Sequence, residues 1–490
     1  MCKRLTFFLF MAAFAIPYVN AQGDSTGTLA QILAEKGVIT SADLARIGSA
    51  SPTDKLSVLT SILQEKGVLT GTDMARLSAP APAGALAQAK GSEPPLSRPA
   101  PAPTLDASFK SGRKLPVSLY GTLLFNAGYN TAGGNIQDVP LFLTKQNSDP
   151  TGGDKNFYET ARQTRIGLSF TPVDALGGKL SGVFEFDMYG GQTALPTGVS
   201  MNLFRMRHAY GRLDWDHVAV EAGQDWSIFA PLNPISFSEY GIPSLTASGN
   251  AWGRYPQIRV EVKNSSGSAH QFLWQVAASD PNMGDYPTNL FSASRTPLIG
   301  ERGRMPSMQT RVAYSKLHND RRFTVGLSGH YGRGKNAGTI GALNVQSPVD
   351  SWGVALDYLL PLTSHFTLTG EAYEGRALGT YSVANGEAIG AVGTVGAHGV
   401  ESRGGWSQAQ WSLAKQWQLN LGYGLDVPKA SQLPVGNRSR NQTYMGNIIY
   451  KLNLNINLAL EYRRLLTDFH NQILANERGD HVDLAVAYTF

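Results

Sequence analysis

Basic residues stand at alternate positions in several segments of this chain. They are Arg165, Arg205, Arg207, Arg259, Lys263 and Arg311. A guanidinium group binds a carboxylate through two parallel hydrogen bonds, so arginines gathered on one wall would favour anionic solutes. Acidic residues lie on interleaved segments, at Glu185, Asp187, Glu221, Asp225 and Glu261. Two hypotheses are therefore open: the arginines select anions, or the acids neutralise them and both sets merely line the wall.

Residues that could form a catalytic or metal site show no comparable pattern. The histidines are His208, His217, His270, His318, His330, His365, His398, His470 and His481. They are scattered without the spacing of metal ligands. No nucleophile is accompanied by a base and an orienting group, and the single cysteine, Cys2, precedes an apolar leader. We therefore predict a protein that is not an enzyme and that holds no metal or cofactor.

The elements that must position these side chains are β-strands. From Val117 onward, apolar and polar residues alternate in segments of about ten residues, which is the length and pattern of a tilted membrane strand. The predicted strands are 117–129, 157–171, 178–190, 203–215, 217–228, 255–264, 269–279, 306–317, 321–333, 350–360, 365–375, 403–414, 416–426, 440–451, 453–465 and 480–490. Tight turns, such as Asp214 to His217 and Lys451 to Asn453, alternate with longer loops. The fold class predicted is all-β, a transmembrane antiparallel barrel of about sixteen strands.

Composition supports strands rather than helices as the membrane-crossing elements. After the first twenty residues, no stretch is long and apolar enough to cross a bilayer as a helix. Trp and Tyr fall near many strand ends, for example Trp215, Trp417 and Tyr450, as in the aromatic girdles of such barrels. A soluble β-sandwich would show the same alternation. The polar face of nearly every strand favours the barrel, whose sixteen strands would enclose a water-filled channel.

The loop from Phe229 to Arg254 differs in composition from an exposed loop. It carries three prolines, several apolar residues and Trp252. Folded inward, it would narrow the channel, with Glu239 and Tyr240 facing the basic wall across a constriction. Packed outside, it would belong to a subunit interface. The sequence leaves both arrangements open.

The N-terminal part of the chain predicts export and a small helical extension. Lys3 and Arg4 precede an apolar run that ends at Ala21, so residues 1–21 are interpreted as a cleaved signal peptide. Residues 22–80 hold two copies of a repeat of about thirty residues, Leu29–Ile47 and Leu59–Leu77.

Each copy is predicted to form two short helices. Gly37 and Gly67 would end the first helix, and Thr40 and Thr70 would cap the second. Residues 81–116 are a linker rich in Pro and Ala, and 117–490 form the barrel.

The last predicted strand ends on the aromatic residue Phe490, and Val482, Leu484, Val486 and Tyr488 share its face. It must pair with the first strand to remove both sheet edges. An end of this kind resembles the signal that barrel-assembly machinery recognises, so that machinery is an expected partner.

Several stretches of the barrel region resemble the DcaP-like porins, within the broader group of trimeric porins of Gram-negative bacteria. The matching stretches are Arg162–Gly167, Phe184–Asp187, Phe204–Gly211, Ala222–Phe229 and Pro256–Arg259. The resemblance implies a homotrimer, a preference for dicarboxylates, and a solute-facing role for Arg165, Arg205, Arg207 and Arg259. The N-terminal extension of that family is a coiled coil, and the repeat in this chain departs from it.

The function predicted is an outer-membrane porin for passive diffusion of small hydrophilic solutes, with a preference for anions such as dicarboxylates. Its pore-lining residues would be Arg165, Arg205, Arg207, Arg259, Arg311, Glu185, Asp187 and Glu221. Both termini would lie in the periplasm, and outer-membrane lipid would surround the barrel. The alternative is a barrel that acts as an envelope anchor, with residues 22–80 bound to peptidoglycan or to a periplasmic protein. Nucleic acid is not an expected partner, because the net charge of +5 is small for 490 residues and the leader indicates export.

Overall fold

The chain divides into two units, Met1–Ala83 and Gly84–Phe490. The computed structural model describes residues 30–31, 33–34, 37–51, 54–66, 117–145, 155–194, 200–264, 268–284, 296–340, 343–383, 389–390, 397–471 and 476–490. The predicted signal peptide, Gly67 and Thr70 of the second repeat, and the 81–116 linker lie outside these residues.

Among the described residues of the first unit, two helices have defined bounds, α2 (Ser41–Ser49) and α3 (Lys55–Glu65). Its core is a small apolar cluster of Ala30, Ile39, Ile47, Leu59 and Ile62. Gly37 has the left-handed φ of +71° that ends a helix, as the sequence predicts. Among the described residues, no helix is long and apolar enough to span a membrane.

The predicted N-cap at Thr40 is present. The Thr40 hydroxyl accepts a hydrogen bond from the Asp43 backbone N–H, and the Asp43 carboxylate accepts one from the Thr40 backbone N–H. This backbone hydrogen bond and the Lys66 ammonium, 2.9 Å from the carboxylate, hold the pKa of Asp43 well below its ordinary value. The cap is therefore complete at neutral pH and is lost only when acid protonates Asp43.

Replacing Thr40 with Ala should destabilise α2 by about 1 kcal/mol, because the Asp43 backbone N–H at the helix start loses its partner, the Thr40 hydroxyl. Hydrogen exchange of the 41–49 amides in the full chain would measure the loss as faster exchange. Thr60→Ala is the matched control, because its hydroxyl bonds only to the Ser57 carbonyl inside α3. Unchanged exchange over α2 in Thr40→Ala would contradict the capping role.

The described part of the second unit contains one large antiparallel sheet of seventeen strands. The strands are β1 (Val117–Asn130), β2 (Asn156–Thr160), β3 (Arg165–Ala175), β4 (Gly178–Asp187), β7 (Arg205–Asp214), β8 (Val218–Trp226), β9 (Arg254–Lys263), β10 (His270–Ser279), β11 (Ser307–His318), β12 (Arg321–Ile340), β13 (Leu343–Leu360), β14 (Phe366–Arg376), β17 (Glu401–Ser412), β18 (Trp417–Pro428), β19 (Arg438–Lys451), β20 (Ile456–Phe469) and β21 (Asn476–Thr489). Two small hairpins, β5 (Gln192–Ala194) with β6 (Ser200–Asn202) and β15 (Ile389–Gly390) with β16 (His398–Gly399), lie outside it. Short 3-10 turns are η2 (Glu301–Gly303), η3 (Gly379–Tyr381) and η5 (Ala430–Gln432).

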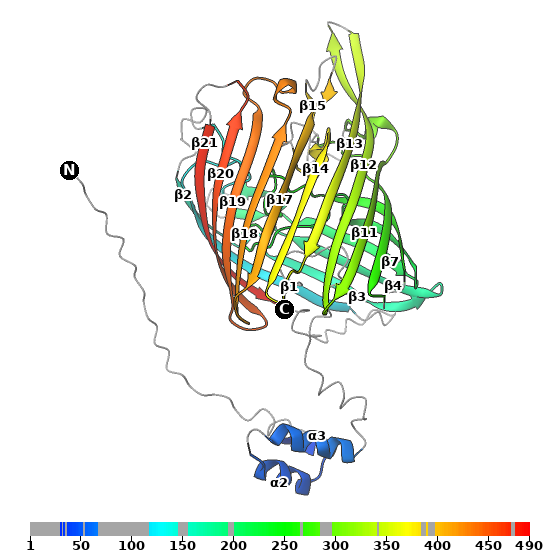
Figure 1. Ribbon diagram of the computed structural model, residues 1–490, viewed down its shortest axis with the longest axis vertical. Helices are drawn as coiled ribbons and strands as arrows, with labels where there is room; N and C mark the ends of the chain where they lie inside the picture. The colour runs from blue at the N-terminus through cyan, green and yellow to red at the C-terminus, as the bar shows by residue number, and fades with distance from the viewer. Residues whose placement is uncertain are drawn as a thin grey trace, which may run out of the picture. The chain divides into compact units, whose positions relative to one another are not determined.

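The sheet closes on itself. β21 pairs with β1 over nine residues, and the Phe490 and Gly121 backbones exchange two further hydrogen bonds of 3.1 Å. β2 and β3 pair in succession with the same strand, β1, so they share one position and the seventeen strands fill sixteen positions. The closed barrel seen in Figure 1 therefore confirms the predicted fold class.

The burial pattern of the barrel is apolar outside and polar inside. Along β1, Leu123 and Phe125 are 48% and 42% exposed, whereas Thr122 and Asn126 are 4% and 0% exposed. A soluble sandwich would bury the apolar face instead. The exposed apolar face fits a lipid environment, because the closed sheet leaves no unpaired strand edge.

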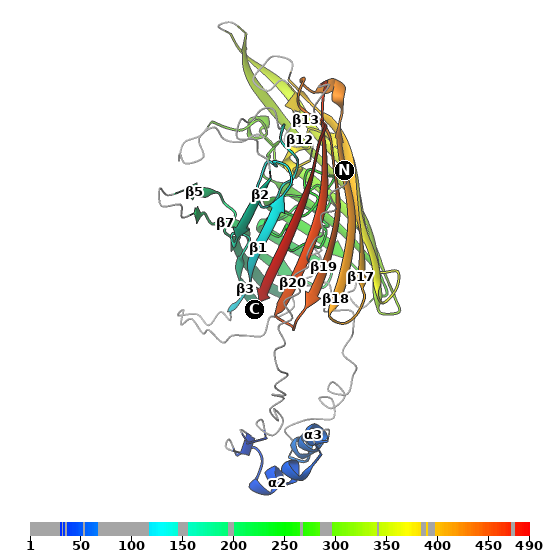
Figure 2. The ribbon, with the colours of Figure 1, turned by 90° about the vertical axis from the view of Figure 1, so that its left-hand side faces the viewer.

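Some strands begin or end at residues other than the predicted ones, because a turn or a long hairpin sets their bounds. The segment predicted as 453–465 begins at Ile456, because Asn453 Oδ1 accepts hydrogen bonds from the Asn455 and Ile456 backbones in a turn. The strands predicted as 321–333 and 350–360 extend through the expected loop, so β12 and β13 form a hairpin that rises beyond the other strands in Figures 1 and 2.

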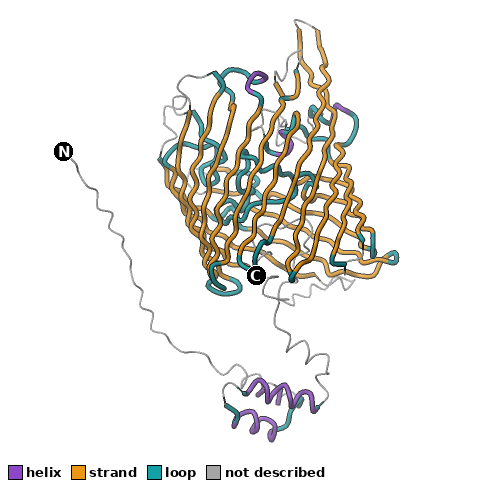
Figure 3. The backbone as a smooth tube through the Cα atoms, viewed as in Figure 1, coloured by secondary structure: helices purple, strands orange, loops and turns teal. Residues whose placement is uncertain are grey.

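Residues 227–253, between β8 and β9, form a loop that we call the inner loop. They carry little regular structure and are almost all buried. Figure 3 shows loop segments, in teal, running through the inside of the barrel. The inner loop therefore folds inward, which is one of the two arrangements that the sequence left open.

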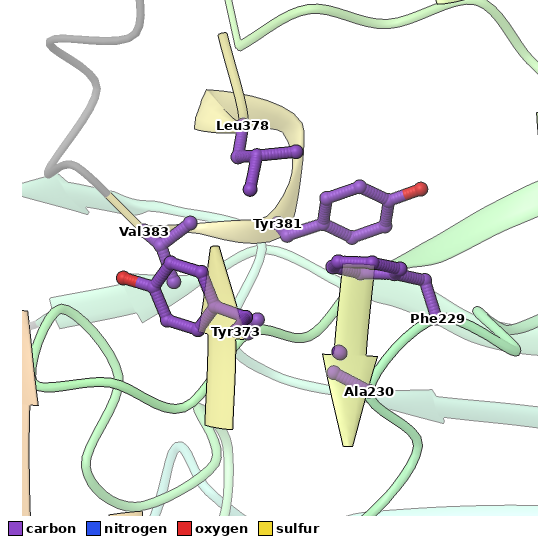
Figure 4. Packing of buried hydrophobic residues seen from close by; sticks show 8 residues of the cluster. Phe229, Ala230, Tyr373, Leu378, Tyr381 and Val383 are labelled. Atoms are coloured by element: carbon purple, nitrogen blue, oxygen red, sulfur yellow. The ribbon is translucent and has the colours of Figure 1, made fainter. Parts of the chain in front are cut away.

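The start of the inner loop is fixed by an aromatic cluster. The Phe229 ring lies 4.6 Å from the Tyr381 ring, and Leu378 and Val383 complete a buried group with Tyr373 of β14 (Figure 4). The Tyr381 hydroxyl is 2.7 Å from Nδ1 of His330, so the polar end of this ring is also satisfied. This packing directs the chain inward as it leaves β8.

Candidate functional site

The inner loop is held by inward-facing side chains of the barrel wall. Asn126 and Gln408 donate hydrogen bonds to the Phe237 and Ile235 carbonyls, each at 3.0 Å. Glu371 accepts one from the Leu232 backbone N–H at 2.5 Å, and Asn441 donates to the Ala247 carbonyl at 2.9 Å. Because β1, β14, β17 and β19 all contribute, the polar wall satisfies backbone groups that the loop cannot satisfy itself.

The two loop residues predicted at a constriction have different partners. Tyr240 faces a predicted cation: the Arg165 guanidinium lies 4.0 Å over its ring and donates to its carbonyl at 3.0 Å. Glu239 instead forms a buried ion pair with Arg463 of β20. Burial raises the pKa of Glu239, and the Arg463 charge opposes that rise. The expectation that Glu239 faces the predicted arginines is therefore wrong, because the loop turns this side chain toward β20.

A group of ion pairs lies where Tyr240 and Gly241 approach β3, β4 and β7. Arg205 binds the Asp187 carboxylate through Nε at 3.0 Å and Nη2 at 2.6 Å. Arg207 donates to Glu185 at 2.6 Å and to Asp187 at 3.1 Å. Arg165 lies 3.5 Å from Glu185. Two carboxylates thus serve three guanidinium groups.

A fourth cation, Arg254 at the start of β9, belongs to this group. Its charged neighbours are Arg165, Arg205, Arg207 and Asp187. We call these four arginines, together with Glu185 and Asp187, the cationic cluster. Four positive and two negative groups leave an excess of two positive charges.

A β-bulge in β7 decides which side chains enter the interior. Glu185 and Phe186 are consecutive on β4, yet they pair with His208 and Met206, so Arg207 is the extra residue. Arg207 and His208 are consequently both buried, and His208 Nδ1 lies 2.7 Å from Asp225. A bulge of one residue shifts the alternation. It therefore places Arg212 in ion pairs with Glu221 and Glu261.

Two further predicted site residues, Arg259 and Glu221, belong to a second group. Arg259 pairs with Glu221 at 2.7 Å, Asp225 at 3.1 Å and Glu261 at 3.0 Å. We call the acidic cluster the set Asp214, Glu221, Asp225 and Glu261 with Arg212, Arg259 and Lys263. Four acids and three cations give an excess of one negative charge. Five of the six residues predicted as one basic wall are therefore divided between two groups whose formal net charges are opposite: Arg165, Arg205 and Arg207 belong to the cationic cluster, and Arg259 and Lys263 belong to the acidic cluster.

Arg311 belongs to neither cluster. It forms a bidentate pair with Asp357 at 2.9 and 2.6 Å, and both side chains are 1% exposed. A neutral, fully buried pair of this kind lines the wall without contributing net charge.

Exposure shows which part of the interior solvent can reach. The Arg205 and Arg165 side chains are 25% and 16% exposed, whereas Arg463 and Arg311 are 1% exposed. The inner loop covers the wall formed by β14 to β21, and it leaves the cationic cluster partly open. Solvent that enters the barrel therefore contacts the Arg165 and Arg205 guanidinium groups, whereas Arg207 is only 2% exposed.

Two functional candidates were not in the predicted set. Arg463 has the same parity as Glu461 on its strand, so the alternation could have placed it inside the barrel. Arg254 lies at the junction of the inner loop and β9, where strand alternation gives no guide. Within the part of the chain that the structure describes, no group of three or more His, Cys, Asp or Glu residues could hold a metal ion.

Among known proteins, this chain matches solved structures. No family model and no curated protein matches this chain. The crystal structure of the outer membrane channel DcaP of Acinetobacter baumannii matches with a TM-score of 0.57 and 20% identity, over 78% of this chain and 99% of that chain. This chain has a porin fold.

Other porins match less well. An anion-selective porin from Comamonas acidovorans has a TM-score of 0.45 and 15% identity, over 76% of this chain and 99% of that one. Salmonella typhi OmpF has a TM-score of 0.43 and 13% identity, over 77% of this chain and 98% of that one. The porin fold assigned here rests on the DcaP match and the closed sheet. At 20% identity or less, the likeness shows the fold and not the selectivity.

Proposed function

We propose that this protein is an outer-membrane porin through which small hydrophilic solutes diffuse passively, with a preference for anions. The observation that carries the proposal is the partly exposed cationic cluster beside the inner loop of a closed barrel. Two carboxylates cannot neutralise four guanidinium groups, so a diffusing anion lowers its energy there and a cation does not.

The porin fold and the apolar outer face of the strands support an outer-membrane location with both termini in the periplasm. A homotrimer, cleavage of the 1–21 leader, and recognition of the Phe490 end by assembly machinery are parts of the same proposal.

The reversal potential under a salt gradient tests the selectivity. Wild-type protein in a planar bilayer with a KCl gradient should conduct and should favour chloride. Arg205→Gln lowers the excess charge of the cationic cluster from two to one, so chloride preference should fall by roughly half. Asp187 keeps Arg207 as a partner in this variant, at 3.1 Å, so folding should be preserved.

Lys179→Gln is the control. This lysine is also ion-paired, to Asp174 at 2.6 Å, but it lies at the β3–β4 turn and is 58% exposed. Its loss should leave the reversal potential unchanged. A wild-type channel that favours potassium would refute the anion preference, and a folded barrel that never conducts would refute the channel itself.

A further inference from the structure

The outer surface of β19, β20 and β21 changes from apolar to charged at the end of these strands opposite Phe490. The three strands lie side by side (Figures 1 and 2). Along β21, Val482 is exposed on the lipid-facing side, and Asp480 is the next residue of the same parity. Along β20, Tyr462 is followed by Arg464 in the same way. Because Arg464 lies directly opposite Asp480, the apolar face ends at the same height on both strands.

The depth of this boundary matches the thickness of the lipid core. From Phe490 to Asp480 the chain rises about 33 Å, and a strand tilt of about 40° reduces this to about 25 Å along the membrane normal. That is the height of the apolar band of an outer-membrane barrel. At the upper boundary, Tyr444 lies directly opposite Arg464, and its ring is 4.8 Å from that of Tyr423. Tyrosines of this kind mark the level of the lipid head groups.

Three arginines and two aspartates form the charged end of this surface. We call the set Arg440, Arg464, Arg478, Asp468 and Asp480 the rim patch. Nη1 of Arg464 donates to both oxygens of Asp480, at 2.9 and 2.8 Å. Arg440 and Arg478 share the carboxylate of Asp468, each at 2.8 Å. The rim patch therefore keeps an excess of one positive charge.

The guanidinium groups of the rim patch can be reached from outside the barrel. The Arg440, Arg464 and Arg478 side chains are 48%, 42% and 31% exposed, and each has the parity of the lipid-facing residues on its strand. In the described part of the chain, the hydrogen bonds of Arg464 all start from Nη1. Its Nε and Nη2 donors are therefore available to a ligand, and an anion can bind there without breaking the pair with Asp480.

We propose that the rim patch binds the phosphate groups of a lipid in the outer leaflet of the membrane. A guanidinium group pairs with a phosphate through two parallel hydrogen bonds. The excess positive charge favours an anionic head group over a zwitterionic one. The acyl chains of the same lipid lie against the apolar face beneath the patch, so one molecule covers both surfaces.

The inference rests on the proposed function for its location, because periplasmic termini place this end of the barrel in the outer leaflet. It adds a partner that the channel activity does not require. It also gives a role to charged side chains on the face of the wall that diffusing solutes do not touch.

Native mass spectrometry of the intact protein in a neutral detergent, titrated with lipid A, tests the site. Lipid A carries phosphate groups on a glycolipid head group, and its dephosphorylated form is the matched probe. The wild-type protein should bind lipid A more tightly than the dephosphorylated form. Arg464→Gln should weaken lipid A binding about fivefold, the contribution typical of one basic residue at a membrane surface. It should leave binding of the dephosphorylated form unchanged.

Lys429→Gln is the control variant. Lys429 directly follows β18, at the same end of the barrel as the start of β19. Its side chain is 51% exposed and pairs with Glu401 at 2.7 Å, so the substitution removes the same charge from a similar ion pair outside the rim patch. Binding of lipid A should stay at the wild-type level.

Three results would overturn the proposal. Equal weakening by Arg464→Gln and Lys429→Gln would show that general surface charge attracts the lipid. Displacement of lipid A by inorganic phosphate would show that the patch binds free ions and not a lipid. A change in subunit number in Arg464→Gln, read from the same spectra, would assign the patch to a contact between copies of the chain.

Planar-bilayer conductance separates this inference from the proposed function. A conducting channel whose lipid A binding does not depend on Arg464 refutes the lipid site alone. A barrel that binds lipid A through Arg464 and never conducts refutes the channel alone.

Discussion

Replacing Arg463 with Met should lower the thermal stability of the barrel and raise its single-channel conductance. Arg463 is buried, and it holds Glu239 of the inner loop and lies 3.4 Å from Glu461. Removing one partner of a buried ion pair typically costs about 3–5 kcal/mol, because the other charge is left without compensation. Burial already raises the pKa of Glu239, so this carboxyl should take up a proton once Arg463 is gone.

The conductance should rise because the pair fixes the middle of the inner loop to β20. Without it, the loop keeps its aromatic anchor at Phe229 and its bonds to Gln408 and Asn441, but the segment around Glu239 loses its strongest attachment. A loosened segment obstructs the interior less, so the mean current should increase and fluctuate more.

A double variant provides the control. Arg463→Met combined with Glu239→Gln removes both charges, and its unfolding temperature should recover part of the loss. Unfolding followed by circular dichroism measures stability, and planar-bilayer recording measures conductance. If Arg463→Met leaves both quantities at wild-type values, the inner loop does not depend on this pair.

Replacing Asp187 with Asn should strengthen the anion preference. Asp187 is buried and accepts hydrogen bonds from Arg205 and Arg207, and also from the Tyr189 backbone at 3.0 Å. Asn has nearly the same shape but no charge, so the excess of the cationic cluster rises from two to three. The energy of an anion beside it should fall further, since Coulomb interactions are strong where little water is present.

The reversal potential in a KCl gradient measures this change, and it should move in the direction opposite to that of Arg205→Gln. Asp174→Asn is the matched control, because it makes the same substitution at a carboxylate that is 86% exposed at the β3–β4 turn. A shift of Asp187→Asn toward potassium would show that the charges of the cationic cluster do not govern selectivity.

The fold was predictable because its signal is local. Side chains of a strand alternate between two faces. The alternation therefore predicts that Leu123 faces lipid and that Asn126 faces the barrel interior. The sixteen positions followed from this alternation. The boundary errors are also local in origin: Asn453 caps a turn through its own side chain, and β12 and β13 continue because they pair with each other along the whole hairpin.

The candidate site was predictable only in part. The alternation correctly places Arg205, Arg207 and Arg259 inside the barrel, where all three form ion pairs. It does not show that Arg311 is neutralised by Asp357, because that contact joins two strands separated by a third, and it depends on register and side-chain length. Nor does it show the bulge at Arg207, which needs the pairing partner on β4.

The sequence by itself determined a polar-lined barrel and the residue types on its inner wall, because strand periodicity is a property of neighbouring residues. Only the tertiary structure decided how charge is distributed along that wall. Net charge depends on which carboxylate each guanidinium reaches across strands, and the path of the inner loop separates Glu239 from the arginines it was expected to face. Both follow from contacts between residues far apart in the chain. For the same reason Arg254, beside a loop and outside the alternation, is the one arginine of the cationic cluster that forms no ion pair with the described residues.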